Sequence, residues 1–194
     1  TYVNKNNISL NAKITPSIFE TNSFLIKKQN DKIKNKFGFG TNENEINLSL
    51  IEYTAFFGSI QIFKYLMLND VNLTPSLWFY AIHGNNAELI HILEDNKVEY
   101  KTEKSQENKN KKSVHAEIII ESIKCHHNDL ANYFQRNFEL NENEIIKIKN
   151  IKYHNYELIN EECLNKSYFN DFCKYKYNKF CKILLETKQI DIDS

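Results

Sequence analysis

The sequence predicts an all-α fold in which helix–turn–helix hairpins stack on one another, with irregular loops inserted between them. The first observation behind this prediction is an internal repeat, because residues 49–73 can be laid over residues 75–99. The second is that apolar residues recur at helical spacing on both sides of a glycine in each copy, which predicts two short helices joined by a turn. The third is that 41% of the 194 residues are apolar, enough for the core of about one domain.

The two copies place small residues at equivalent positions. Ala55 falls on Ala81 and Gly58 falls on Gly84, and each pair lies 26 residues apart. An alanine at this position lets two helices approach closely. Glycine tolerates positive φ, so we expect Gly58 and Gly84 to end the first helix of each hairpin and to reverse the chain.

Capping residues are expected at the ends of these helices. Ser59 or Asn86 stands where the second helix of a hairpin would begin, and Thr74-Pro75 would open the second copy as a cap followed by a first-turn proline. Asn96 and Asn137 follow the apolar positions of two second helices. Because asparagine adopts the left-handed conformation more readily than other residues except glycine, we expect both at the C′ position.

Two further copies are predicted in the C-terminal half of the sequence. Ser122 and Cys125 stand at the alanine and glycine positions of the third copy. Cys173 and Lys176 stand at the same positions of the fourth. In both copies the apolar residues of a second helix follow at the expected spacing, so each is predicted to form another hairpin.

The two clear copies resemble ankyrin repeats, and they closely resemble the divergent ankyrin proteins expanded in protists such as trichomonads. The resemblance is carried by Ala55, Gly58, Leu66 and the DVNL tail at 70–73 in one copy, and by Thr74-Pro75, Ala81, Gly84 and Leu93 in the other. It implies an ankyrin-type solenoid that binds a protein partner on its concave helical face. Glu52 and Trp78 replace the family's histidine, so its inter-repeat hydrogen bond is expected to be absent. A spacing of 26 residues also leaves little room for the family's β-hairpin finger.

The resemblance predicts that residues 1–194 form one ankyrin-repeat domain, as a fragment of a longer array whose two ends resemble the segment after a second helix. A short helix is also expected near Pro16–Leu25, and an irregular helix within 139–162. The predicted segments are a divergent repeat remnant and loop at 1–48, two clear repeats at 49–99, a charged and mobile loop at 100–113, a third divergent repeat at 114–138, an irregular connection at 139–166 and a fourth divergent repeat at 167–193.

The charge balance excludes several classes of partner. Lys+Arg and Asp+Glu are 25 each, and Arg136 is the only arginine. Nucleic-acid and anionic-membrane binders need a basic surplus, and bidentate phosphate recognition needs arginine. The lysines within 100–113 are diluted by Glu103 and Glu107, which is typical of a solvated linker. No apolar stretch approaches the length of a membrane-spanning helix, and no signal peptide is visible. We expect no nucleic acid, no membrane and no small-molecule substrate as partner.

The cysteines indicate a reducing, cytoplasmic compartment. They form no CxxC pair and no framework of a small secreted domain. We expect all four to be buried or half-buried thiols that pack as small apolar groups: Cys125, Cys163, Cys173 and Cys181.

The Cys125-His126-His127 run with Asp129 is the nearest approach to a reactive constellation. It could hold a metal or pair a nucleophile with a base, but adjacent residues seldom converge on one ion or reach one another. A polar turn between two helices is the favoured interpretation. His115 and His154 are isolated in the sequence. We therefore expect no catalytic residue, no metal and no cofactor.

The candidate partner-binding residues stand just before the hairpin turns. In ankyrin proteins the equivalent positions often face the binding groove, and here their chemistry differs from one copy to the next. The alternative is a solvated or lightly packed helix end. Trp78 is either an interface anchor or a filler of the space that the family's histidine would occupy. The full candidate set is Phe56, Phe57, Trp78, Ile82, His83, Ile123 and Lys124.

The sequence therefore predicts a non-enzymatic scaffold for protein–protein interaction inside the cell. Each hairpin exposes an apolar face until its neighbour covers it, so a stack of hairpins builds a rigid surface. The alternative is a structural spacer attached to a functional domain outside this segment.

Overall fold

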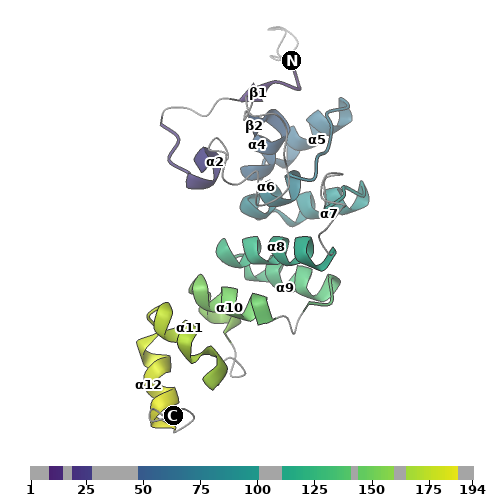
Figure 1. Ribbon diagram of the computed structural model, residues 1–194. Coiled ribbons are helices and arrows are strands. Elements are labelled where there is room, and N and C mark those ends of the chain that lie inside the picture. The colour runs from purple at the N-terminus through teal and green to yellow at the C-terminus, as the bar shows by residue number, and fades with distance from the viewer. Residues whose placement is uncertain are drawn as a thin grey trace. The chain divides into compact units, whose positions relative to one another are not determined.

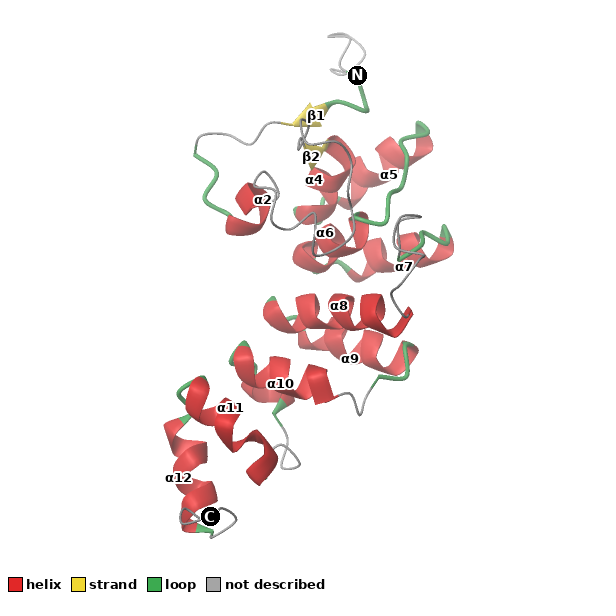
Figure 2. Cartoon of the chain, viewed as in Figure 1, coloured by secondary structure: helices red, strands yellow, loops and turns green. Residues whose placement is uncertain are grey.

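The computed structural model describes residues 9–14, 19–27, 48–100, 111–140, 144–159 and 165–187 (Figure 1). This part of the chain is mostly helical, with ten α-helices, two short 3₁₀ helices and one two-stranded sheet (Figure 2). The predicted all-α class is confirmed. The chain divides into two compact units, Thr1–Val114 and His115–Ser194, which we call the first and the second unit and describe separately. None of the described helices has the length and apolar character needed to cross a membrane.

Two helical hairpins make up most of the first unit. One consists of α4 (Leu50–Phe56) and α5 (Ile60–Leu68), and the other of α6 (Leu77–Gly84) and α7 (Ala87–Asp95). Within each hairpin the two helices pack together, and α4 packs against α6 (Figure 1). The two clear copies in the sequence therefore form the two hairpins that their spacing predicts.

The core of this unit follows the apolar positions of the second helices. Phe63 and Leu66 on α5 are buried, as are Ile90 and Leu93 on α7. Burial of one such side chain contributes about 1.5–3 kcal/mol to folding. Ile62, the residue before Phe63 on α5, is exposed.

The N-terminal segments add a small sheet and a short helix to the first unit. Strand β1 (Lys13–Ile14) pairs antiparallel with β2 (Leu48–Ser49). Helix α2 (Ser23–Lys27) begins after Asn22, whose Oδ1 accepts a hydrogen bond from the backbone N–H of Phe24 at 2.9 Å. The helix expected near Pro16–Leu25 thus begins later, and Pro16 itself lies outside the described residues.

The caps of the first unit agree only partly with the prediction. Asn86 caps α7, since its Oδ1 accepts from the backbone N–H of Glu88 at 3.0 Å. Among the described residues, Ser59 makes no side-chain capping bond at the start of α5. Thr74-Pro75 does not open α6 directly. Thr74 instead begins a tight turn, in which its carbonyl accepts from the N–H of Leu77 at 3.0 Å.

The two glycines of the repeat have different roles, so the prediction for Gly84 is wrong. Gly58 has φ +62° and reverses the chain as predicted. Gly84 is the last residue of α6, and its neighbour Asn85 takes the left-handed conformation with φ 46°. A Cβ atom at position 84 would lie 2.2 Å from the carbonyl oxygen of Ala55. Glycine is needed there because α6 passes very close to the backbone of α4.

The other two predicted hairpins and an intervening helix belong to the second unit, except that the first turn of α8 precedes its boundary at His115. The core cluster of this unit consists of Ile151, Tyr168, Phe172, Tyr177 and Leu184. The third copy forms α8–α9, the fourth forms α11–α12, and α10 lies in the predicted irregular connection. The bounds are α8 Lys111–Lys124, α9 Asn128–Asn137, α10 Glu144–Lys152, η2 Tyr156–Leu158, η4 Lys166–Tyr168, α11 Phe169–Lys174 and α12 Asn178–Glu186.

One turn geometry recurs along the chain. The left-handed residues of the turns that end the first helices are Gly58, Asn85, His126, His154 and Lys176. Lys176 is the position predicted from the alignment, whereas Cys125 precedes the left-handed residue by one position. After four of these residues, the next N–H donates to the carbonyl five residues earlier, as from Asn155 to Asn150 at 3.0 Å. This hydrogen bond is typical of a Schellman motif.

The second helices also end in this way, but not at the predicted asparagines. Asp70, Lys97 and Glu139 take the left-handed conformation there. Asn96 is one residue too early, and its Nδ2 donates to the carbonyl of Ile92 at 2.7 Å. Asn137 is the last residue of α9. The predicted charged loop falls largely on residues 101–110, which lie outside the described part of the chain.

Candidate partner-binding site

Side chains at the turns link neighbouring hairpins within each unit. In three turns the residue after the left-handed position donates a side-chain hydrogen bond to the turn of the preceding hairpin or helix. Asn86 donates to Gly58 at 3.3 Å, Asn155 to Ile123 at 3.2 Å and Tyr177 to Ile151 at 2.9 Å, with a backbone carbonyl as acceptor each time. These lateral bonds fix the turns of one unit side by side.

A further hydrogen bond links the two hairpins of the first unit through Glu52. Glu52 closes a capping box with Ser49 at the start of α4. Its Oε1 also accepts a hydrogen bond from Ser76 Oγ, which precedes α6, at 2.5 Å. The expected absence of the family's histidine bond stays a prediction.

Aromatic rings gather at the turn ends of α4 and α6. The first aromatic cluster consists of Phe24, Tyr53, Phe56, Phe57, Tyr80 and His83. The centroid of the Phe24 ring lies 3.8 Å from that of His83 and 5.9 Å from that of Phe56. Burial, and secondarily the charge of Glu52, raise the pKa of Tyr80 well above its usual value.

Four candidate residues remain accessible to a partner. Phe57 exposes 53% of its surface at the end of α4, and its ring lies 4.7 Å from that of Tyr53. Phe56 and His83 are half-buried within the first aromatic cluster. Lys124, in the second unit, is exposed, and its Nζ lies 2.8 Å from an oxygen of Glu121.

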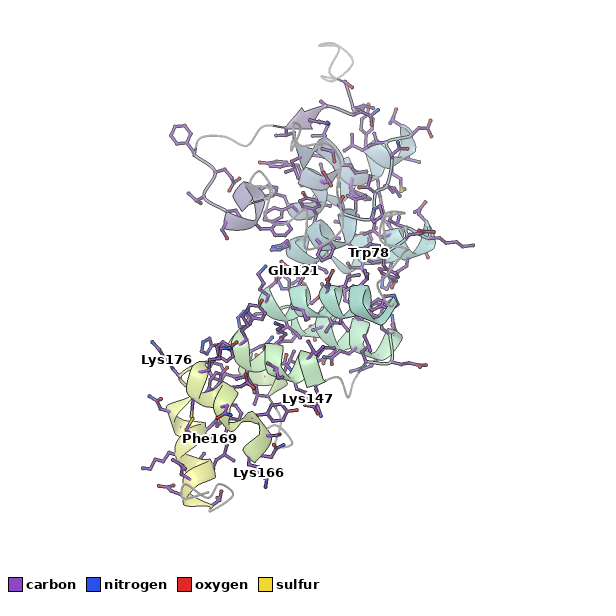
Figure 3. All side chains as sticks on the ribbon, in the orientation of Figure 1. Trp78, Glu121, Lys147, Lys166, Phe169 and Lys176 are labelled. Carbon is purple, nitrogen blue, oxygen red and sulfur yellow. The ribbon has the colours of Figure 1, made fainter. Side chains whose placement is uncertain are left out.

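Trp78, Ile82 and Ile123 are buried, so their predicted role as partner contacts is wrong. Trp78 exposes only 1% of its surface. Its Nε1 donates to the backbone carbonyl of Val98 at 3.1 Å, and its ring stacks on Tyr100 with centroids 4.5 Å apart. The tryptophan therefore joins α6 to the segment after α7, which agrees with the interpretation that it fills internal space. Figure 3 labels Trp78.

Phe24 is the site residue that the sequence did not reveal. It reaches the cluster from α2 and lies 26 residues before Leu50, the first residue of α4, and no local pattern connects the two segments. Leu25 beside it is buried. The short helix expected near Pro16–Leu25 was the one feature of the sequence that could have pointed to Phe24. Helix α2 therefore occupies part of the face on which Phe56 and His83 were expected to meet a partner.

A second aromatic cluster lies at the turns of the second unit. It consists of His154, Tyr156, Phe172, Tyr177 and Phe180. His154, which gave no signal in the sequence, stacks on Tyr177 with centroids 5.1 Å apart. Burial, and secondarily Tyr156, raise the pKa of Tyr177 to about 12. Tyr156 exposes 63% of its surface, and His154 is exposed as well, so these two are the accessible members of the cluster.

His115, the other histidine without a sequence signal, also has an aromatic neighbour. Its ring stacks on Phe138 with centroids 3.9 Å apart. Both isolated histidines thus pack against aromatic rings of the second unit.

The Cys125-His126-His127 run forms the polar turn that was predicted. Helix α8 ends at Lys124, His126 is left-handed, and α9 begins at Asn128. Burial, and then the charge of Glu121, raise the pKa of Cys125 to about 12 despite the opposing charge of Lys124. The thiol is therefore protonated at neutral pH, which disfavours its use as a nucleophile. Within either unit taken alone, the described residues bring no three histidine, cysteine or acidic side chains to ligand distance of one another.

The accessible rings of the two clusters can contact apolar and aromatic groups of another protein, because aromatic surfaces supply a large contact area with few rotatable bonds.

A scan against protein-family models gives no match for this chain, and no curated protein or solved structure reaches significant similarity to it.

Proposed function

We propose that the chain is a non-enzymatic protein-binding module of divergent ankyrin type, and that it binds its partner along the turn ends of its first helices. The observation that carries the proposal is Phe57, a large aromatic side chain that is 53% exposed at the edge of a packed aromatic cluster. Aromatic anchors set in packed surroundings dominate the binding energy of many protein interfaces.

Rigidity supports the same function. The Schellman turn at Gly58 and the lateral hydrogen bond from Asn86 to Gly58 hold the backbone beneath the first aromatic cluster. A surface that is already ordered loses little conformational entropy on binding. The first unit thereby offers a preformed apolar patch rather than one that must be assembled around the partner.

The linker between the first two hairpins forms no β-hairpin that could contact a partner. Residues 69–76 are all described, and they form turns and coil. Ankyrin repeats can present a projecting β-hairpin in this region. We therefore assign recognition to the turn ends of α4 and α6, with α2 as one wall of the surface.

The test compares two exposed apolar side chains of the first unit. Phe57→Ser removes the proposed anchor. Leu68→Ser is the matched control, because Leu68 exposes 78% of its surface on α5 and lies outside the first aromatic cluster. The full chain and both variants are immobilised, exposed to lysate of the cells that express it, and compared by quantitative mass spectrometry after their thermal melts have been matched.

The expected result is a protein retained by the wild type and by Leu68→Ser and weakened about tenfold or more by Phe57→Ser. Equal retention by both variants would contradict the assignment to this surface. Retention no greater than that of an unrelated helical protein would contradict the binding function itself. Trp78→Ala is unsuitable as a probe, because it would remove a buried ring and its hydrogen bond to Val98.

A further inference from the structure

Two cysteines of the last hairpin lie next to each other. Cys173 on α11 and Cys181 on α12 place their Sγ atoms 3.5 Å apart, and both thiols are free. Cys173 is exposed and Cys181 is partly buried. Cys173 thus departs from the expectation that every cysteine packs as a small buried group.

The packing of the hairpin maintains this distance. Phe172 and Tyr177 of the core cluster flank the turn between α11 and α12, and Leu184 continues the same core along α12. The N–H of Tyr177 donates to the carbonyl of Phe172 at 2.8 Å, and left-handed Lys176 occupies the turn (Figure 3). The packed core and the hydrogen-bonded turn therefore keep the two helices, and with them the two sulfur atoms, close to each other.

Disulfide formation requires only a small movement of the side chains. The sulfurs of a disulfide are about 2.05 Å apart, so the gap must close by about 1.5 Å. The proposal requires that rotation of the two cysteine side chains about χ1 supplies this displacement.

We propose that Cys173 and Cys181 are a redox-sensitive dithiol, which a hydroperoxide converts into a reversible disulfide between α11 and α12. Cys173 attacks first, because it is the exposed member of the pair. Its thiolate displaces one oxygen of hydrogen peroxide, which gives a sulfenic acid at Cys173 and, after protonation, one water. Cys181 then attacks the sulfenic sulfur, the S–O bond breaks, and a second water leaves. Two thiols and one peroxide thus yield one disulfide and two waters, and the two electrons pass from the sulfurs to the peroxide.

The surroundings assign the second step to Cys181. Burial, and then the hydrogen bond with Cys173, raise the pKa of Cys181 to about 11, so it is a poor first nucleophile at neutral pH. It is nonetheless in position once Cys173 carries a leaving group. A dithiol reductant would reverse the reaction by thiol–disulfide exchange.

The experiment treats the reduced full chain with hydrogen peroxide, blocks the remaining thiols by alkylation under denaturing conditions, and maps the products by mass spectrometry. Trypsin cleaves after Lys174, Lys176 and Lys179, all between the two cysteines, so the disulfide will join two separate peptides. We expect this cross-link to form about tenfold or more faster than any oxidation of Cys125, and to disappear with dithiothreitol.

Variants test the order of attack. Cys181→Ser should accumulate a sulfenic acid at Cys173, which dimedone traps, whereas Cys173→Ser should give no such adduct at Cys181. Cys125→Ser is the matched control and should form the cross-link at the wild-type rate. Oxidation of Cys173 and Cys125 at equal rates, or conversion of Cys173 to sulfinic acid without a cross-link in the wild type, would overturn the proposal.

Discussion

Replacement of Gly84 by alanine tests the closest backbone approach in the first unit. The new Cβ would lie 2.2 Å from the carbonyl oxygen of Ala55 and 3.1 Å from the backbone nitrogen of Gly58. Neither neighbour is a flexible side chain, because both atoms belong to the backbone of the α4 hairpin. Helices α4 and α6 must therefore separate by about 1 Å at this point, as in other overpacked sites.

The magnitude follows from three effects. Overpacking of a close contact costs about 1–3 kcal/mol. Separation of the helices would also stretch the 3.3 Å bond from Asn86 to Gly58, and a lost hydrogen bond costs about 1 kcal/mol. Alanine favours the helix over glycine by up to about 1 kcal/mol, which partly offsets these losses. We expect the free energy of unfolding of the first unit to fall by about 2 kcal/mol.

Trp78 makes this loss measurable in the first unit alone. It is the only tryptophan, and it lies on the same helix as Gly84. Its fluorescence during a urea titration reports the unfolding of α6, whereas circular dichroism would combine both units. The midpoint and slope of the titration give the change in free energy.

Asn85→Gly is the control, because it introduces a glycine at the neighbouring position, whereas Gly84→Ala removes one. Asn85 has φ 46°, a conformation that glycine adopts without strain, so this variant should be neutral or slightly more stable. A Gly84→Ala protein as stable as the wild type would refute the close-contact argument. A destabilised Asn85→Gly protein would refute the assignment of the left-handed residue.

Three further predictions concern other turns. Gly58→Val should lower the free energy of unfolding by about 1 kcal/mol or more, as measured by the Trp78 titration. Valine resists φ +62°, and its Cβ would lie 3.1 Å from the carbonyl oxygen of Gly84. An unchanged midpoint would mean that this turn is not left-handed. Asn155→Ala removes the side-chain hydrogen bonds that Asn155 donates to Ile123 and Asn128. It should lower the stability of the second unit by about 1–2 kcal/mol, as measured by amide hydrogen exchange in α8 and α11. Unchanged exchange rates would show that the lateral bond contributes nothing to stability. Tyr177 retains its proton in the folded state up to about pH 12, whereas the unfolded state loses it near pH 10.0, so stability should fall as pH rises through this window. Tyr177→Phe should lack that part of the fall in urea midpoints followed by circular dichroism, and an identical pH dependence would contradict the assignment.

The sequence determined the helices and their pairing into hairpins. Apolar residues at helical spacing on either side of a turn specify two short amphipathic helices whatever lies around them. This was enough to locate α4–α5, α6–α7, α8–α9 and α11–α12, and to identify Gly58 and Lys176 as turn residues. It was also enough to interpret Cys125-His126-His127 as a polar turn.

Only the tertiary structure decided what each turn-end side chain does. Gly58 and Gly84 look equivalent in the alignment, but one supplies positive φ and the other makes room for a neighbouring helix. Trp78 and Phe57 were both plausible contacts for a partner, and burial separates them. Phe24 and the Cys173–Cys181 pair depend on segments that meet only after folding. A local pattern encodes backbone periodicity, whereas burial and lateral contact depend on which distant residues pack alongside, and that is fixed only when the hairpins stack.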